Sequence, residues 1–315
     1  MDNVVSLVGI FGLLGLAWLL SAERRCVNWR LIGGGLALQL AFAAFVFHVP
    51  AGARLFLFLN AAVVRVLDAA SAGVRFCFGR LALPPGAVSE TGETSLGFIL
   101  AFQALPTIVF FSALVSVLYF YRILPALIRG FAWVFARLLR VSGAEALCAA
   151  SNIFVGVESA LTVKPYLERM TRSELCAVLT AGLATVSSNV MALYVFVLQE
   201  TFPNIAGHLI SASMLSAPAA LMMSKLLLPE REAPLTLGRT VAPYAEREAS
   251  VFEAIIQGAN DGLRLIMGIV ALLLAVLGLV ALADLLLGAA GGRLNAWTGW
   301  GVDWSLKTLL GWLFW

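Results

Sequence analysis

The chain contains 315 residues, of which 61% are hydrophobic and only 12% are charged, and its mean hydropathy is +0.94. Soluble domains carry about 25% charged residues, so this composition excludes a soluble globular protein and indicates an integral membrane protein. The net charge of +3 reflects basic loops beside membrane spans and does not indicate a nucleic-acid-binding surface; no nucleic acid is expected among the partners.

Six uncharged runs are long enough to cross a bilayer as helices. A transmembrane helix needs about 20 apolar residues, whereas barrel strands would be about ten residues long with alternating polarity, and the sequence shows no such alternation. The sequence therefore predicts an all-α integral membrane protein with six transmembrane helices. The uncharged runs comprise residues 3–22, 31–53, 94–121, 175–199, 201–224 and 265–283.

Lysine and arginine are distributed unevenly between the two sets of loops. With the N-terminus outside, the inner segments are residues 22–30, 121–172 and 225–264, and they hold most of the 21 basic residues. Because positively charged loops stay in the cytoplasm, we expect a multi-pass protein of a cell membrane, here a bacterial inner membrane, with its N-terminus outside. The first run follows no basic segment and is expected to be a retained span rather than a signal peptide.

The first part of the chain divides into three segments. Residues 1–50 hold the first two spans. Residues 51–95 carry arginines among apolar residues at helical spacing, followed by a polar loop, a pattern typical of a helix that lies in the outer interface of the membrane. Residues 96–122 form the third span, in which Pro106 removes a backbone hydrogen bond.

Residues 123–165 combine an inner amphipathic helix with a segment that is too polar for an ordinary span. Between Arg140 and Lys164 the chain is largely apolar but includes Glu145, Asn152 and Glu158. Basic residues flank both ends, so both ends are expected on the cytoplasmic side and the segment is expected to enter the membrane and return as a re-entrant helical hairpin. Non-helical backbone at membrane depth is tolerated only inside protein or against a water-filled cavity. This hairpin is therefore the first candidate for a transport site.

The rest of the chain holds three more spans. The fourth and fifth occupy residues 166–228, and the fourth is interrupted near its middle by the polar stretch TVSSN at residues 185–189. Discontinuous helices of this kind hold substrate and coupling ions in secondary transporters. We further expect a cytoplasmic connector at residues 229–250, the sixth span within residues 251–288, and an aromatic helix at the outer interface within residues 289–315.

Two groups of residues in the interrupted segments could carry function. An ionised Glu158 at mid-membrane costs about 2.5–3.5 kcal/mol, so its partner is expected to be a substrate, an ion or a proton; the alternative is that Glu158 is hydrated at the cytoplasmic mouth. Asn152 and the hydroxyl groups of residues 185–188 could form an oxygen-rich cage for a hard monovalent cation, or could serve only as hydrogen bonds between helices. The residues themselves leave both interpretations open.

No catalytic residues are predicted. The sequence lacks the HExxH, GxSxG and glycine-rich phosphate-loop motifs, so an enzyme is not expected. The four cysteines, Cys26, Cys77, Cys148 and Cys176, are scattered and form no CxxC pair, which predicts neither a metal site nor a disulfide framework. No cofactor is expected apart from a coupling ion.

Five stretches of the sequence resemble the concentrative nucleoside transporter family, in the family's order. The resemblance implies part of an inverted-repeat transporter fold and symport of nucleosides with sodium or protons by alternating access. It also implies a homotrimer surrounded by membrane lipid, in which a mobile transport domain containing the hairpin moves against a scaffold containing residues 1–50. The stretches are 97–120 (GFILAFQALPTIVFFSALVSVLYF), 151–175, 182–195 (GLATVSSNVMALYV), 213–230 (SMLSAPAALMMSKLLLPE) and 253–282.

The resemblance also assigns an ion site. In the family, sodium is bound by an Asn side chain, a Thr side chain and two backbone carbonyls. The matching positions here are Asn152, Thr185 and the carbonyls of Val155 and Val186. Apart from this possible sodium site, no metal site is implied.

The resemblance places the nucleoside between the hairpin and the fourth span. Family members carry a Gly-Gln-Thr-Glu-Ala-Pro stretch in the hairpin whose Gln, Thr and Glu contact the base. This chain reads Gly156-Val157-Glu158 there, so the Gln is missing and Glu158 aligns with the family's Glu through a gap. With Val190, which matches a residue that packs against the nucleobase, the implied substrate-binding residues are Val157, Glu158 and Val190.

Family members continue past an interfacial helix into a second hairpin and two further spans that bind the ribose. The sequence stops at Trp315, so the resemblance leads us to expect an incomplete transporter or one that works with another polypeptide. The alternative, from a different functional class, is a membrane sensor or scaffold protein that retains one ligand-binding hairpin and does not transport.

Overall fold

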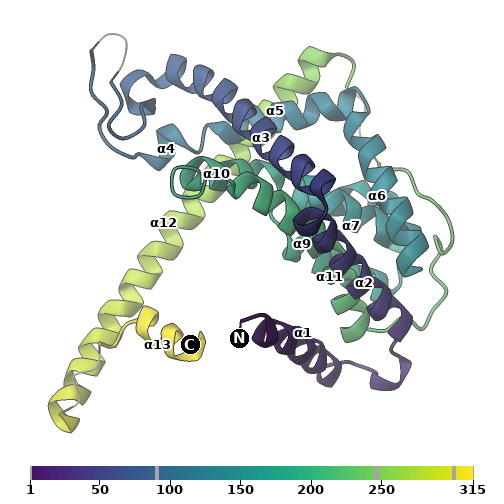
Figure 1. The fold of residues 1–315 in the computed structure, drawn as a ribbon. Helices are drawn as coiled ribbons and strands as arrows, with labels where there is room; N and C mark the ends of the chain where they lie inside the picture. The colour runs from purple at the N-terminus through teal and green to yellow at the C-terminus, as the bar shows by residue number, and fades with distance from the viewer. Residues whose placement is uncertain (1, 89–91, 245–247, 300–302, 315) are drawn as a thin grey trace. The chain divides into compact units, whose positions relative to one another are not determined.

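The computed structural model describes residues 2–88, 92–244, 248–299 and 303–314. Apart from two isolated β-bridges, every regular element within these ranges is a helix, which confirms the predicted all-α class. The chain divides into two units, residues 1–262 and 263–315, and each is described by itself (Figure 1).

The first unit begins with the helices α1 (Asp2–Leu19), α2 (Trp29–His48) and α3 (Pro50–Phe78). The side chain of Asn28 caps α2 by accepting a hydrogen bond from the N–H of Leu31. α3 follows almost at once because Pro50 suits a first helical position, where the missing N–H is not needed. Two short 3₁₀ turns, η1 (Arg24–Cys26) and η2 (Gly79–Ala82), follow α1 and α3.

The third predicted span is broken at Pro106, where the sequence indicated an interruption. The break separates α4 (Leu100–Gln103) from α5 (Thr107–Phe120). Gln103 is buried, and its amide nitrogen donates hydrogen bonds to three backbone carbonyls in the preceding loop, those of Leu81, Leu83 and Gly97. This side chain therefore fastens the loop after η2 to the start of the span.

The hairpin and the two spans after it complete most of the first unit. The hairpin consists of α7 (Gly143–Val155), η3 (Gly156–Glu158), α8 (Ser159–Thr162) and η4 (Lys164–Arg169), and it follows α6 (Ile123–Leu139). The fourth span is broken as the polar stretch predicted, into α9 (Arg172–Ala184) and α10 (Ser188–Leu198). The fifth span is α11 (Ile205–Leu227).

α7 lies at the centre of the main hydrophobic core. It packs against α6, α9 and α11 (Figure 1). Its alanines at positions 144, 146, 149 and 150 have no exposed surface, and such small side chains let neighbouring helix backbones approach closely. A segment that is too polar for contact with lipid is thereby enclosed by protein, as the sequence predicted.

Among the described residues, six helices are long and apolar enough to cross a membrane, which matches the predicted number. α3 with η2 is one of them, and the described part of α1 adds the shorter apolar helix Val8–Leu19. The position of residues 51–95 in the outer interface stays a prediction. The six candidates are Trp29–His48, Pro50–Ala82, Leu100–Phe120, Arg172–Leu198, Ile205–Leu227 and Val251–Trp297.

The second unit comprises the later part of α12 (Val251–Thr298) together with α13 (Leu306–Phe314). α12 continues beyond the boundary predicted at residue 288, and α13 lies within the range predicted for the helix after it. The indole nitrogen of Trp304 donates to Asn295 (3.0 Å), and the N–H of Leu306 donates to the carboxylate of Asp284 (2.7 Å). Asp284 therefore fastens the start of α13 to α12.

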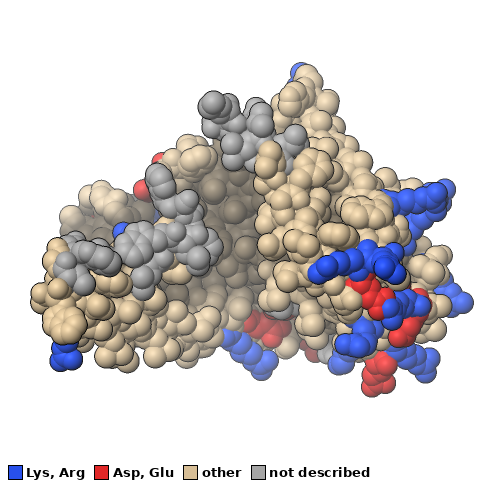
Figure 2. Space-filling model, turned by 90° about the horizontal axis from the view of Figure 1, so that it is seen from below, with Lys and Arg blue, Asp and Glu red and all other residues tan. Residues whose placement is uncertain are grey.

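The loops that were predicted to be cytoplasmic meet at one end of the first unit. The side chains of Glu23 and Arg231 form an ion pair, and the N–H of Ala22 donates to the carbonyl of Leu227 (2.9 Å). Figure 2 shows Lys, Arg, Asp and Glu gathered on part of the visible face, while most of the remaining visible surface is uncharged. This distribution suits a multi-pass protein, because charged side chains are costly against hydrocarbon.

Candidate functional site

The two arms of the hairpin return to the same end of the first unit. At the start of the first arm, Ser142 and Glu145 form a capping box for α7. After the second arm, Thr171 and Glu174 form an equivalent box for α9. Both boxes are joined to Lys225, near the end of α11. Both ends of the hairpin therefore lie at one end of the first unit, as a re-entrant hairpin requires, and its second arm runs on through η4 beyond Lys164.

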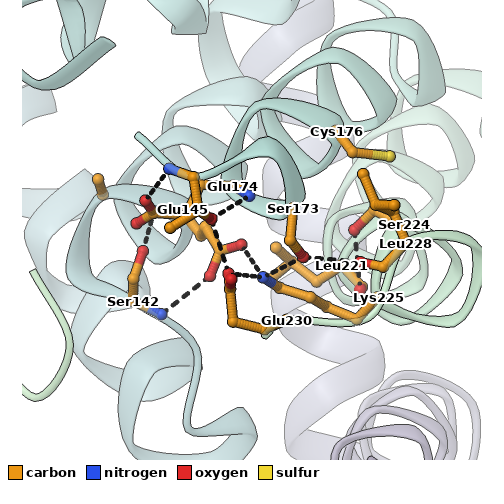
Figure 3. A network of polar contacts seen from close by, with 12 residues as sticks. Ser142, Glu145, Ser173, Glu174, Cys176, Leu221, Ser224, Lys225, Leu228 and Glu230 are labelled. Atoms are coloured by element: carbon orange, nitrogen blue, oxygen red, sulfur yellow. Dashed lines mark hydrogen bonds and ion pairs between the residues drawn. The ribbon is translucent and has the colours of Figure 1, made fainter. Parts of the chain in front are cut away.

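Lys225 connects the two arms through a buried ionic network (Figure 3). Its ammonium nitrogen lies 2.5 Å from Glu145 Oε1 and 3.0 Å from Glu230 Oε2, and it donates to Ser173 Oγ at 2.8 Å. The side chains of Lys225 and Glu145 are only 7% and 1% exposed. A buried ion pair is tolerated only when further hydrogen bonds satisfy the charged groups, and here all three ammonium donors have oxygen partners.

Glu230 is the member of this network that lies outside the spans. Burial raises the pKa of its carboxyl group, but the hydrogen bond and charge of Lys225, together with a hydrogen bond from the Thr171 hydroxyl (2.9 Å), outweigh burial. The pKa of Glu230 is therefore lowered from its ordinary value, so the network favours the ionised carboxylate.

We expect the network to weaken in acid. A carboxyl group whose pKa is lowered by folding contributes stability above its unfolded pKa of about 4.3, and this contribution is lost as the pH falls through the lower folded pKa. Thermal unfolding of the purified protein should show that Glu230→Gln unfolds at a lower temperature than wild type at neutral pH and approaches it in acid. The matched control is Glu168→Gln, at an exposed position on η4. A difference between Glu230→Gln and wild type that does not change with pH would contradict this role.

The tip of the hairpin meets the break in the fourth span. α7 is followed by Gly156, where φ is +66° and ψ is −137°, a conformation that is strained for any residue except glycine. A Cβ atom at this position would collide with the backbone and side chain of Ser187. The hydroxyl of Ser188 donates to the carbonyl of Phe154. The two interruptions that the sequence indicated separately are thus in direct contact.

Asn152 is fully buried at this junction. Its side-chain amide donates to the carbonyl of Ala181, and its side-chain oxygen accepts a hydrogen bond from the Ser159 hydroxyl (3.4 Å). Its backbone carbonyl accepts one from the Thr185 hydroxyl (3.2 Å). The structure therefore brings Asn152 and Thr185 together, and it also realises the hydrogen bonding between helices that was the alternative interpretation of these residues.

Two helix C-termini converge at the same junction. α7 ends at Val155 and α9 ends at Ala184, and the last carbonyls of a helix carry partial negative charge and lack partners within the helix. These carbonyl oxygens lie near the amide and hydroxyl oxygens of Asn152, Ser159 and Thr185. Together they are oxygen ligands of the kind that hard cations prefer. Among the described residues, no group of three or more His, Cys, Asp or Glu could hold a metal ion. The chemistry of the junction suits a monovalent cation.

A cavity of about 320 Å³ lies beside the hairpin, and Glu158 and Val155 form part of its wall. α5 contributes Ser116 and Tyr119, and the second arm contributes Lys164. Small-molecule sites usually have volumes of about 300–1,000 Å³. The exposed side chain of Glu158 therefore borders a space that is large enough for a small ligand.

The other predicted substrate and ion residues lie elsewhere in the hairpin and fourth span. Val190 is half-buried in the first turn of α10, and Val186, in the break, is 38% exposed. Neither belongs to the described lining of the Glu158 cavity. The side chain of Val157 lies outside the described part of the structure.

Sequence analysis did not point to Ser159 or Lys225. Ser159 follows Glu158 directly and is as buried as Asn152. Its position in the polar hairpin was the only feature of the sequence that could have indicated a role in the site. Glu145 lies in the first turn of α7, where it forms the capping box with Ser142. Its ion pair with Lys225 joins distant parts of the sequence, and no local pattern indicates such a contact.

Three family models match consecutive parts of the chain. They are the N-terminus of a Na⁺-dependent nucleoside transporter at residues 8–81, a nucleoside recognition module at residues 101–201, and the C-terminus of a Na⁺-dependent nucleoside transporter at residues 208–315. The matched segments include the hairpin, both halves of the fourth span and α12.

Curated relatives agree with these models. An uncharacterized transporter of Haemophilus influenzae is 36% identical over 100% of this chain and 71% of its own length. The nucleoside permease NupC of Helicobacter pylori is 36% identical over 90% of this chain and 65% of its own. Sodium/nucleoside cotransporter 1 of Oryctolagus cuniculus is 32% identical over 89% of this chain, which spans only 40% of that protein.

Solved structures show the same similarity. A variant of CNTnw in an outward-facing state superimposes with a TM-score of 0.85 at 35% identity, over 100% of this chain and 71% of that one. CNTnw in an inward-facing substrate-bound state gives a TM-score of 0.83 at 36% identity with the same coverage.

Proposed function

Because the chain belongs to the concentrative nucleoside transporter family, we propose that it carries nucleosides across the cell membrane by alternating access, coupled to the entry of sodium. Each 100 mV of membrane potential makes the entry of one sodium ion more favourable by about 2.3 kcal/mol of free energy. This free energy drives uptake of the nucleoside. The chain is a membrane transporter and not an enzyme.

The observation that carries the proposal is the junction between the hairpin tip and the broken fourth span. Asn152 and Thr185 meet there at the C-termini of α7 and α9. We propose that Asn152, Thr185 and the carbonyls of Val155 and Val186 bind the coupling ion. The partial negative charge at these helix ends supports a cation, and the Thr185 hydroxyl supplies a neutral oxygen ligand.

The nucleoside is proposed to bind beside this junction, in the cavity bordered by Glu158. A carboxylate accepts hydrogen bonds from the N–H and O–H groups of a nucleoside, and Val155 lies in the same wall, so the proposed ion and substrate sites share a residue. Val157 is proposed to add an apolar contact to the base, and Val190 to add another from outside the described cavity wall. The hairpin and broken span would then belong to the mobile domain, residues 1–50 to the scaffold, and three copies would assemble with their N-termini outside.

Replacing Glu158 by glutamine is expected to raise the KM for uridine roughly 10- to 100-fold, because a hydrogen bond to a charged group contributes about 1.5–3 kcal/mol. Uptake of radiolabelled uridine by cells that produce the full gene product, with and without a sodium gradient, measures this. The matched control is Glu168→Gln, which changes an exposed acid in the same hairpin. A KM unchanged by Glu158→Gln would remove this residue from the substrate site.

The same assay tests the function itself. Uptake that follows the sodium gradient supports the proposal, whereas uptake that follows a pH gradient and ignores sodium would replace the coupling ion by a proton. Binding of uridine to the purified protein without any uptake would instead identify a membrane sensor or scaffold protein.

A further inference from the structure

The segment between α11 and α12 lies across both arms of the hairpin. Residues 234–244 of this segment are named the strap here. The strap was expected to be a cytoplasmic connector, yet its backbone and the side chains of Thr236 and Tyr244 contact the hairpin. It therefore has a fixed position beside the candidate site.

The strap caps the first arm. The carbonyl and hydroxyl oxygens of Thr236 accept hydrogen bonds from the N–H groups of Gly143 (3.0 Å) and Ala144 (3.1 Å), and Leu237 forms an antiparallel bridge with Ser142. The first N–H groups of a helix have no partners within the helix, so Thr236 satisfies two that α7 leaves open.

The strap is also anchored in the core. Val241 is only 6% exposed and belongs to the hydrophobic cluster around α7. A Cβ atom on Gly143 would collide with the carbonyl oxygen of Arg239, so the strap lies too close to α7 for any larger residue there. These contacts fix the strap on the first arm before it reaches the second.

Tyr244 joins the strap to the second arm. Its N–H donates to the carbonyl of Thr162 (2.9 Å), and the ammonium group of Lys164 lies 5.9 Å from the centroid of its ring, in cation–π distance. Tyr244 also lines the cavity that Glu158 borders, and its side chain is accessible, with the residue 42% exposed. An aromatic ring is thereby held in the wall of the proposed nucleoside cavity.

We propose that Tyr244 is a further substrate-contacting residue, which presents its ring to the nucleobase while Glu158 accepts hydrogen bonds from the nucleoside. This assignment rests on the proposed function. Bases stack favourably on aromatic side chains whatever their hydrogen-bonding pattern, and the cation–π contact with Lys164 orients the ring. The ring contributes to affinity for purine and pyrimidine nucleosides alike, and more for the larger purine bases.

Tyr244→Leu tests this assignment while leaving the strap in place, because the backbone N–H that bonds to Thr162 is retained. The KM for nucleoside uptake is expected to rise roughly 5- to 100-fold, more for adenosine than for uridine, with little change in the unfolding temperature. Tyr244→Phe keeps the ring and is expected to stay close to wild type. Tyr121→Leu, which removes an exposed tyrosine at the end of α5, is the matched control.

Thr236→Val separates this role from a merely structural one. It removes the side-chain acceptor for the N–H of Ala144, so it should lower the unfolding temperature without changing the ratio of KM values for adenosine and uridine. Wild-type KM values in Tyr244→Leu would overturn the assignment and leave the proposed function intact. Absence of nucleoside binding and uptake in the wild type would overturn both.

Discussion

Replacing Lys225 by methionine is expected to lower the free energy of unfolding by about 3–5 kcal/mol, because it leaves the buried carboxylate of Glu145 without its counter-charge. The methionine side chain has a similar length but provides none of the three hydrogen-bond donors. Ser173 and Glu230 lose a partner at the same time. At roughly 2 °C per kcal/mol, the unfolding temperature of the detergent-solubilised protein should fall by about 6–10 °C.

A second substitution shows whether the uncompensated charge is the cause. Glu145→Gln in the Lys225→Met background removes that charge, so the double variant should regain part of the lost stability, and the two effects should not add. Lys307→Met, at an exposed position on α13, serves as the control and should unfold like wild type. Equal unfolding temperatures for Lys225→Met and wild type would show that the network does not stabilise the fold.

Replacing Gly156 by alanine is expected to abolish most uptake. A φ of +66° with a ψ of −137° costs a residue with a Cβ about 1–3 kcal/mol in strain, and the added methyl group would collide with the backbone of Ser187. The tip and the break would have to separate, which displaces Asn152 from Thr185. We expect uridine uptake to fall more than about 10-fold, a change that corresponds to only about 1.4 kcal/mol.

The matched control for this variant is Gly130→Ala. Gly130 lies inside α6, and a Cβ there would meet no heavy atom within 4 Å. Alanine is about 1 kcal/mol better than glycine inside a helix, so this variant should be as stable as wild type or more so. Normal uptake and sodium dependence in Gly156→Ala would show that the close contact between tip and break is not needed for function.

The fold class and the interrupted segments could be predicted from the sequence because they depend on local composition. The run of uncharged residues around Pro106 indicated both a span and its break, and TVSSN at residues 185–189 indicated the second break. The charges at Arg140 and Lys164 indicated a hairpin because flanking charges report on the side of the membrane.

The rest depends on contacts between distant segments. Lys225 ends an uncharged run, which suggested a loop position, yet it is buried because Glu145 and Glu230 approach it from other elements. The strap lies in a segment that looks like a solvated connector in the sequence, and its partners, among them the open N–H groups of α7 and the carbonyl of Thr162, come from distant residues. Val190 stays a predicted contact of the base, while the cavity wall in this structure is formed by α5, the hairpin and the strap.

The fully buried alanines of α7 have a mechanical consequence. With side chains no larger than a methyl group at 144, 146, 149 and 150, the helix has no free space in which to rotate or slide, because interiors are close-packed and enlarging a side chain typically costs about 1–3 kcal/mol. The first arm is therefore wedged between α6, α9 and α11. Any rearrangement that displaces Asn152 has to shift these neighbouring helices as one block.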